Sequence, residues 1–176
     1  MLLRKINAGL GLLSTVLLMG HAIFLAAWML SRGSFPNFDT PLPWILVWAV
    51  AAHAIISIVL AFLGHKGAEK RKCNFYPKLN PSTIVQRASG ILLLLFTAPH
   101  IAGVTGVLQP SQPVHAILPP LFFAVSMAHV AVSTSKAFIT LGIGNAEFIK
   151  TLDAVVKVVC VATLIADVAG FFLFLY

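Results

Sequence analysis

The stretch PWILVWAVAAHAIISIVLAFLG, residues 43–64, contains no Asp, Glu, Lys or Arg, and its single ionisable side chain is that of His53. An α-helix needs about 20 apolar residues to cross the roughly 30 Å of hydrocarbon in a bilayer. Residues 43–64 are long enough to do so. The stretch therefore predicts a membrane-spanning helix that carries a histidine near its middle.

Other parts of the chain have the same character. They are residues 8–30, 85–108, 116–137 and 152–176. The chain of 176 residues is 59% hydrophobic and only 10% charged, which excludes an ordinary soluble domain. The first stretch follows Arg4 and Lys5, but it is longer than a secretion signal and no small-residue cleavage site follows it. We therefore expect an all-α membrane protein, a bundle of five transmembrane helices that forms one domain over residues 1–176.

The basic residues predict how these helices are oriented. Arg32 alone flanks one side of the five-helix arrangement. The opposite side is flanked by Arg4, Lys5, Lys66, Lys70, Arg71, Lys72, Lys78, Arg87, Lys136, Lys150 and Lys157. An excess of Lys and Arg marks the cytoplasmic side, so we expect a cytoplasmic N-terminus in a multi-pass protein of the cytoplasmic (inner) membrane. The net charge of +7 is then a topology signal that also suits an acidic protein surface or anionic lipid, and nothing supports nucleic acid binding.

A histidine lies in each of the first four apolar stretches: His21, His53, His100 and His129. Ionisable groups at membrane depth are rare and usually functional, and histidine is a common axial ligand of haem iron. One alternative is that each histidine only hydrogen-bonds a neighbouring helix, but four on four helices make that less favoured. The histidines thus predict two haem sites, of the b type because no C-x-x-C-H attachment motif is present.

The depth of each histidine suggests how they pair. His21 follows Asn7, and His100 follows Arg87, by nearly the same number of residues, which puts both about 20 Å from the cytoplasmic boundary. His53 and His129 lie equally far after Pro43 and Pro119, which we take as the outer ends of their helices. The expected pairs are therefore His21 with His100, and His53 with His129.

Residues 85–91, VQRASGI, resemble the Gln-Arg-x-Ser/Thr-Gly signature of the cytochrome b anchor subunits of succinate:quinone oxidoreductases. His53 followed by an apolar half-helix and a basic link into that signature is similar to the five-helix, two-haem branch of this family. The resemblance covers the first four stretches, and the fifth matches only in character. It implies that His21 and His100 ligate the distal haem and His53 and His129 the proximal haem, in agreement with the depth pairing.

The resemblance also implies a function. The chain would be an electron-transport subunit of the respiratory chain, in a succinate dehydrogenase or a quinol:fumarate reductase, without organic catalysis of its own. Two haem b groups would connect a cytoplasmic iron–sulfur subunit and an FAD-containing flavoprotein subunit with membrane quinone, menaquinone being the expected one, and the complex could dimerise. Arg87 and Ser89 are candidates for contact with a haem propionate, while the alternative for Arg87 is a snorkelling basic residue.

Quinone chemistry also needs proton acceptors, and acids are scarce. Asp39 is the only acid of the outer loops and is the first candidate beside a quinol site, with a loop turn residue as the alternative. Asp167, at the expected depth of His21 and His100, is the second. Its alternative is a protonated carboxyl hydrogen-bonded to neutral helix partners. His65 and His115 fall at helix ends and are expected to be interfacial.

Two other functions stay open. One is the cytochrome b anchor of another respiratory enzyme, a formate dehydrogenase or hydrogenase, against which the 85–91 signature argues. The other is a haem-free transporter or assembly protein whose histidines form a proton relay. The chain also departs from the family: its outer loops are short, Pro99 could kink the helix before His100, and Met127 and Ala128 stand where some members carry a glutamate that is implicated in proton transfer.

Overall fold

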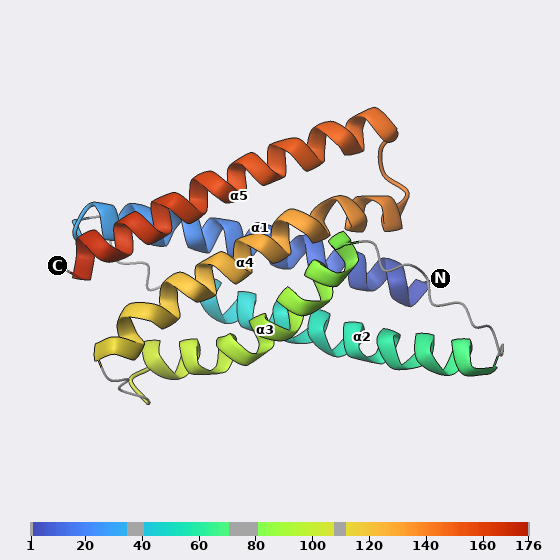
Figure 1. Cartoon of the computed structure of the whole chain (residues 1–176), viewed down its shortest axis with the longest axis horizontal. Coiled ribbons are helices and arrows are strands. Elements are labelled where there is room, and N and C mark those ends of the chain that lie inside the picture. The colour runs from blue at the N-terminus through green and yellow to red at the C-terminus, as the bar shows by residue number, and fades with distance from the viewer. Residues whose placement is uncertain (1, 35–40, 71–80, 108–111, 176) are drawn as a thin grey trace.

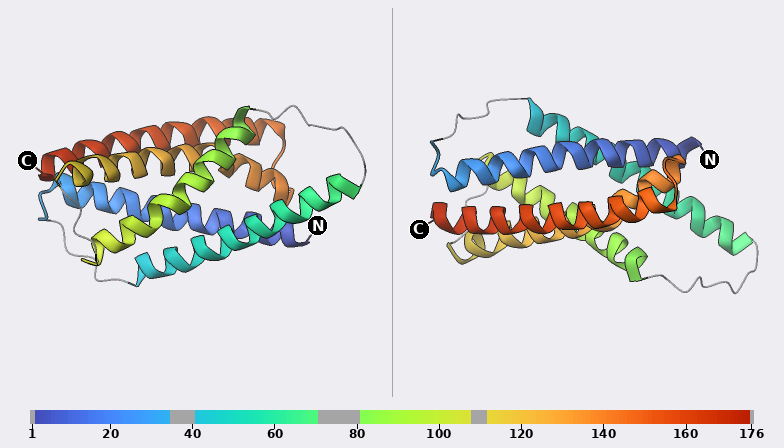
Figure 2. Two further views of the ribbon diagram at one scale, coloured as in Figure 1. Left: turned by 60° about the horizontal axis from the view of Figure 1, so that its bottom comes forward. Right: turned by 90° about the horizontal axis from the view of Figure 1, so that it is seen from above.

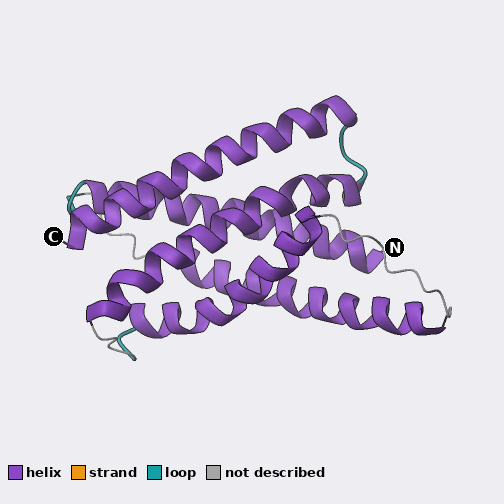
Figure 3. Ribbon diagram, viewed as in Figure 1, coloured by secondary structure: helices purple, strands orange, loops and turns teal. Residues whose placement is uncertain are grey.

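The computed structural model of the chain is all-α (Figure 1). It describes residues 2–34, 41–70, 81–107 and 112–175, without the side chains of 64–70 and 112–115. The helices are α1 (Leu2–Leu30), α2 (Leu42–Lys70), α3 (Pro81–Val104), α4 (Gln112–Leu141) and α5 (Ala146–Leu175). No strand occurs in the described ranges (Figure 3). All 5 helices are long and apolar enough to cross a membrane, which confirms the predicted multi-pass, all-α fold.

Most helices extend beyond the apolar runs that predict them. The first begins at Leu2 instead of residue 8, the second continues to Lys70, and the fifth begins at Ala146. The links expected over 65–84 and 140–151 are correspondingly shorter. The reason is that a backbone hydrogen bond needs no apolar side chain, and long basic side chains near a helix end reach water from the helix. Helix α3 also begins early, at Pro81 instead of residue 85, but it ends at Val104, before residue 108.

One assumption behind the depth pairing is wrong. Pro43 lies in the first turn of α2, where proline is tolerated, but Pro119 lies well inside α4, which begins at Gln112. A proline at the edge of an apolar run is therefore not always a helix start. Its missing N–H costs one backbone hydrogen bond within the helix, and α4 continues through it.

The two ends of the bundle differ in charge. The N-terminus lies at the same end as the close of α2 and α4 and the start of α3 and α5, and the C-terminus lies at the opposite end (Figures 1 and 2). We call the first the basic end; its basic residues with described side chains are Arg4, Lys5, Arg87, Lys136, Lys150 and Lys157. Which end faces the cytoplasm stays a prediction.

Packing between the helices is uneven. Helices α1, α4 and α5 all contact one another, whereas α2 packs on α1 and α3 packs on α4. Small residues allow the closest approach: a Cβ on Gly170 of α5 would lie 3.4 Å from the carbonyl oxygen of Ala26 on α1. Among the described residues the pairs α1–α3, α2–α3 and α2–α4 pack marginally or not at all. Helices α2 and α3 also diverge toward the basic end (Figures 1 and 2).

Candidate functional site

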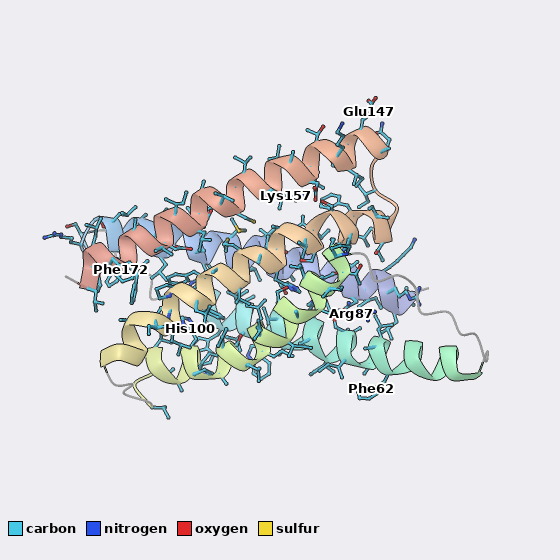
Figure 4. The ribbon with its side chains drawn as sticks, in the orientation of Figure 1. Phe62, Arg87, His100, Glu147, Lys157 and Phe172 are labelled. Carbon is cyan, nitrogen blue, oxygen red and sulfur yellow. The ribbon has the colours of Figure 1, made fainter. Side chains whose placement is uncertain are left out.

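The four intramembrane histidines lie in two places. His100 lies in the part of α3 away from the basic end, whereas Arg87 lies at the basic end of the same helix (Figure 4). His21 and His100 line one pocket, and we call them the far pair. His53 and His129 are close enough for their charges to interact, and we call them the near pair. The structure thus brings together the same histidines that the depth argument pairs.

Each pair bridges two helices that do not pack directly on each other. The far pair connects α1 with α3, and the near pair connects α2 with α4. Helices in direct contact have axes about 8–10 Å apart, which leaves no room for a flat group between two facing imidazoles. A flat group between the histidines therefore needs helices that do not pack directly on each other, and both pairs meet that condition.

His53 is held by the first turns of α1. Its Nδ1 atom lies 3.1 Å from the backbone carbonyl oxygen of Asn7. The side chain of Asn7 in turn exchanges hydrogen bonds with Ser57 of α2, at 3.1 and 3.2 Å. A carbonyl oxygen can only accept, so Nδ1 of His53 carries the hydrogen, and in the neutral ring, which burial favours, Nε2 keeps its lone pair.

His129 is held in the same way by α3. Its Nδ1 atom lies 3.0 Å from Oγ of Ser89, which is buried. The hydroxyl of Ser89 has one hydrogen, and it donates this hydrogen to the carbonyl oxygen of Val85 at 2.6 Å. Toward His129 the hydroxyl therefore accepts, and Nδ1 of His129 carries the hydrogen. Both imidazoles of the near pair thus present an unprotonated Nε2, the form in which histidine binds metal.

Glycines make room for both near-pair rings. A Cβ added at Gly11 of α1 would lie 3.0 Å from Cε1 of His53, and one added at Gly90 of α3 would lie 3.3 Å from Cε1 of His129. Both distances are shorter than an ordinary van der Waals contact. Gly90 belongs to the 85–91 signature, so its small size has a direct structural use here.

The far pair has a different environment. The ring of Phe122 stacks on His100, with centroids 4.7 Å apart and planes at 26°. Asp167 of α5 and Ser126 of α4 line the same pocket, and neither has a hydrogen-bond partner for its side-chain oxygens. Within the described part of the chain no hydrogen bond is found to either far-pair ring. The oxygens of Asp167 make no hydrogen bond to a described residue, so this structure does not show the alternative of a carboxyl bonded to neutral helix partners.

At the basic end, the side chain of Lys136 on α4 contacts polar side chains of α3. The amino group of Lys136 donates to Oε1 of Gln86 at 3.0 Å and reaches Oγ1 of Thr83 at 3.5 Å. Arg87 is exposed and close enough to Lys136 for their like charges to interact. The described residues offer neither cation an acidic partner. The two cations together suit an anionic group bound between α3 and α4.

Sequence reasoning overlooked two of these residues. The sequence places Lys136 on one helix face with His129 and Ser133, but its contacts with α3 have no sequence signature. Asn7 serves there only to count depth, and its contact with His53 has no sequence signature. Asp39 and the side chains of His65 and His115 lie outside the described residues.

The donor set consists of two pairs of imidazoles. No three His, Cys, Asp or Glu side chains gather into a ligand set among the described residues, and a protein-bound ion ordinarily needs three or four. Two facing imidazoles suffice where a macrocycle supplies the remaining ligands. Comparison with protein-family models, curated proteins and solved structures finds no match for the chain.

Proposed function

We propose that this chain is the haem-b-binding membrane anchor of a succinate:quinone oxidoreductase, with two bis-histidine haems in the cytoplasmic membrane. One observation carries the proposal. Two pairs of imidazoles each bridge helices that do not pack on one another, and the near pair has both Nδ1 hydrogens engaged, by Asn7 and by Ser89. This arrangement suits axial ligation through Nε2.

The role of the chain is to bind and orient its redox groups. His53 and His129 would hold the proximal haem, and His21 and His100 the distal one. Bound haem would supply the one-electron chemistry of iron, which no amino-acid side chain here provides. Asn7 and Ser89 fix the tautomers of the near pair, Gly11 and Gly90 keep its rings unobstructed, and the low-dielectric helices exclude water.

Arg87 and Lys136 give the near site a charged edge. Carboxylates pair well with Arg and Lys, and haem carries two of them as propionates. The two cations lie at the basic end of α3 and α4, close to His129 through Ser89 and Gln86. We assign them to the propionate side of the proximal haem; Ser89, whose only hydrogen goes to Val85, supports His129 and does not bind a propionate.

The basic end is the proposed docking face for soluble partners. Its described cations outnumber its described acids, which include Glu147 and Asp153, and Asp153 already pairs with Lys157. An iron–sulfur subunit that binds there, itself carrying the FAD-containing flavoprotein, would exchange electrons with the proximal haem. Membrane quinone, with menaquinone as the expected species, would be the other redox partner.

The rival proton relay is less well supported. A relay must pass a hydrogen from group to group, but Nδ1 of His53 donates to a backbone carbonyl, which cannot pass it on. The anchor of a formate dehydrogenase or hydrogenase keeps the haems and changes the partner. The 85–91 signature favours the succinate:quinone family over that alternative.

The deciding experiment is a dithionite-reduced minus oxidised spectrum of the purified protein, with haem quantified as the pyridine haemochrome. We expect b-type bands and two haems per chain. A protein that folds in the membrane without haem would refute the proposal, and a stoichiometry of one would remove one of the two pairs.

A further inference from the structure

Asp167 is the most deeply buried acid that the structure describes. Its exposed fraction is 0%, and both carboxyl oxygens lack a hydrogen-bond partner. Ser126 of α4 lines the same pocket, is 2% exposed, and its hydroxyl is also unpartnered. Burying a carboxyl group without partners is costly, and nearly all buried polar groups in proteins are satisfied. These orphaned oxygens therefore indicate a contact that is not made in this structure.

The pocket that Asp167 lines also contains both far-pair histidines. The cavity measures about 20 Å³, which is room for one ordered water between polar groups. Helix α5 packs directly on α1 and not on α3. Gly170, one turn beyond Asp167, approaches the backbone of Ala26, about one turn beyond His21. Asp167 is therefore placed toward His21 more than toward His100.

The imidazoles of the near pair have hydrogen-bond partners, whereas none is found for those of the far pair in the part of the chain that the structure describes. His53 and His129 each donate Nδ1–H to an oxygen on a neighbouring helix. No hydrogen bond to His21 is found among the described residues. Metal-bound histidines almost always donate their second N–H to a carboxylate, a carbonyl or water. Asp167 and Ser126 are the only orphaned acceptors described in this pocket.

We propose that the carboxylate of Asp167 accepts the Nδ1–H of His21, directly or through one water that also contacts Ser126, and so acts as a positioning residue for the far iron site. The inference rests on the proposed function, because it takes His21 as an iron ligand. A carboxylate partner raises the basicity of the imidazole, and so its electron donation to the iron, more than the carbonyl and hydroxyl partners of the near pair do. Its negative charge also offsets the positive charge of oxidised iron, so Asp167 favours the oxidised form of the far site alone.

The test is a potentiometric titration of both haem components in Asp167→Asn. The asparagine keeps the size of the side chain and removes the charge. We expect the far component to shift upward by at least a tenfold change in its oxidised-to-reduced ratio, 59 mV for a one-electron couple, while the near component does not move. Thr163→Val removes another buried polar group from α5, outside the pocket, and should move neither component.

A wild-type measurement covers the case in which Asp167→Asn does not assemble. Infrared difference spectra between the oxidised and reduced far site, with ¹³C-labelled aspartate, should contain a shifted carboxylate band. An unmoved far potential, or a difference spectrum without that band, overturns the inference when both haems are present. Absence of haem would instead overturn the proposed function, so the two failures are distinguishable.

Discussion

Oγ of Ser89 lies 3.0 Å from Nδ1 of His129, across the interface between α3 and α4. The same hydroxyl donates its only hydrogen to Val85, one turn earlier in its own helix. The side chain of Ser89 therefore links the backbone of α3 to His129 on α4, and it fixes which nitrogen of that imidazole carries the hydrogen. Ser89 of the 85–91 signature thus has a physical role, because its hydroxyl contacts both its own helix and α4.

Replacing Ser89 should affect the near haem alone. Ser89→Ala removes the hydroxyl that accepts from Nδ1 of His129, and losing such a supporting partner typically weakens metal retention about 10- to 100-fold. We expect the His53–His129 component to be lost selectively when the protein is incubated with apomyoglobin as a haem acceptor. Ser89→Thr is the matched control, because its hydroxyl can still bond a carbonyl one turn earlier and accept from His129. Equal haem loss from both components of Ser89→Ala would contradict the assignment.

Replacing either histidine of a pair should abolish the same haem component. His53→Ala and His129→Ala should each abolish one spectral and potentiometric component, and His21→Ala and His100→Ala should each abolish the other, because two residues that share a haem are both needed. Redox titration monitored in the haem α band is the measurement. His65→Ala serves as the control that keeps both components. If His21 and His53 variants lost the same component, the pairing would be wrong.

The glycines beside the near pair should not tolerate a methyl group. Gly11→Ala places a Cβ 3.0 Å from His53, and Gly90→Ala places one 3.3 Å from His129. Overpacking of this kind commonly costs about 1–3 kcal/mol. We expect reduced occupancy of the near haem in both variants, measured as haem per protein. Gly9→Ala and Gly103→Ala are matched helical controls with nothing within 4 Å, and normal occupancy in all four variants would sink the steric argument.

The basic end should bind the catalytic partners. A tag at the N-terminus, next to the start of α1, should co-purify a flavoprotein and an iron–sulfur protein that interconvert succinate and fumarate with an artificial dye. Charge reversal of Lys150, at the start of α5, should weaken this recovery, because it lowers the positive charge of that face. The same reversal at Arg32, at the opposite end, is the control. Recovery of a molybdenum or nickel–iron enzyme would favour the alternative anchor family.

Asp39 should matter for quinone turnover and not for haem binding. A proton acceptor must lie within hydrogen-bond reach of the quinol, directly or through one water, and Asp39 is the only acid of the outer loops. Asp39→Asn should slow quinol-linked electron transfer while both haem spectra and dye-linked succinate oxidation stay normal. Wild-type quinone activity in this variant would move the acceptor elsewhere, and the region of Ser89 and Arg87 would become the next candidate.

Hydropathy alone was enough to predict the membrane-spanning helices and to find one histidine in each of the first four. The reason is that crossing a bilayer depends on a local sum over about 20 residues, which can be read without knowing any contact. The same count misjudged the helix ends, since charged residues such as Lys70 continue a helix that has left the apolar run. It also misjudged Pro119, because a proline can lie inside a helix as well as at its start.

The tertiary structure alone decided what surrounds each histidine. Asn7 and His53 are 46 residues apart, and Ser89 and His129 are 40 apart, so their contacts depend on how each helix is rotated about its axis and on which helices are neighbours. The shared pocket of His21, His100 and Asp167 arises in the same way from three helices. Sequence determines which residues can enter the membrane, whereas helix packing determines which of them meet, because packing is set by side chains distant along the chain.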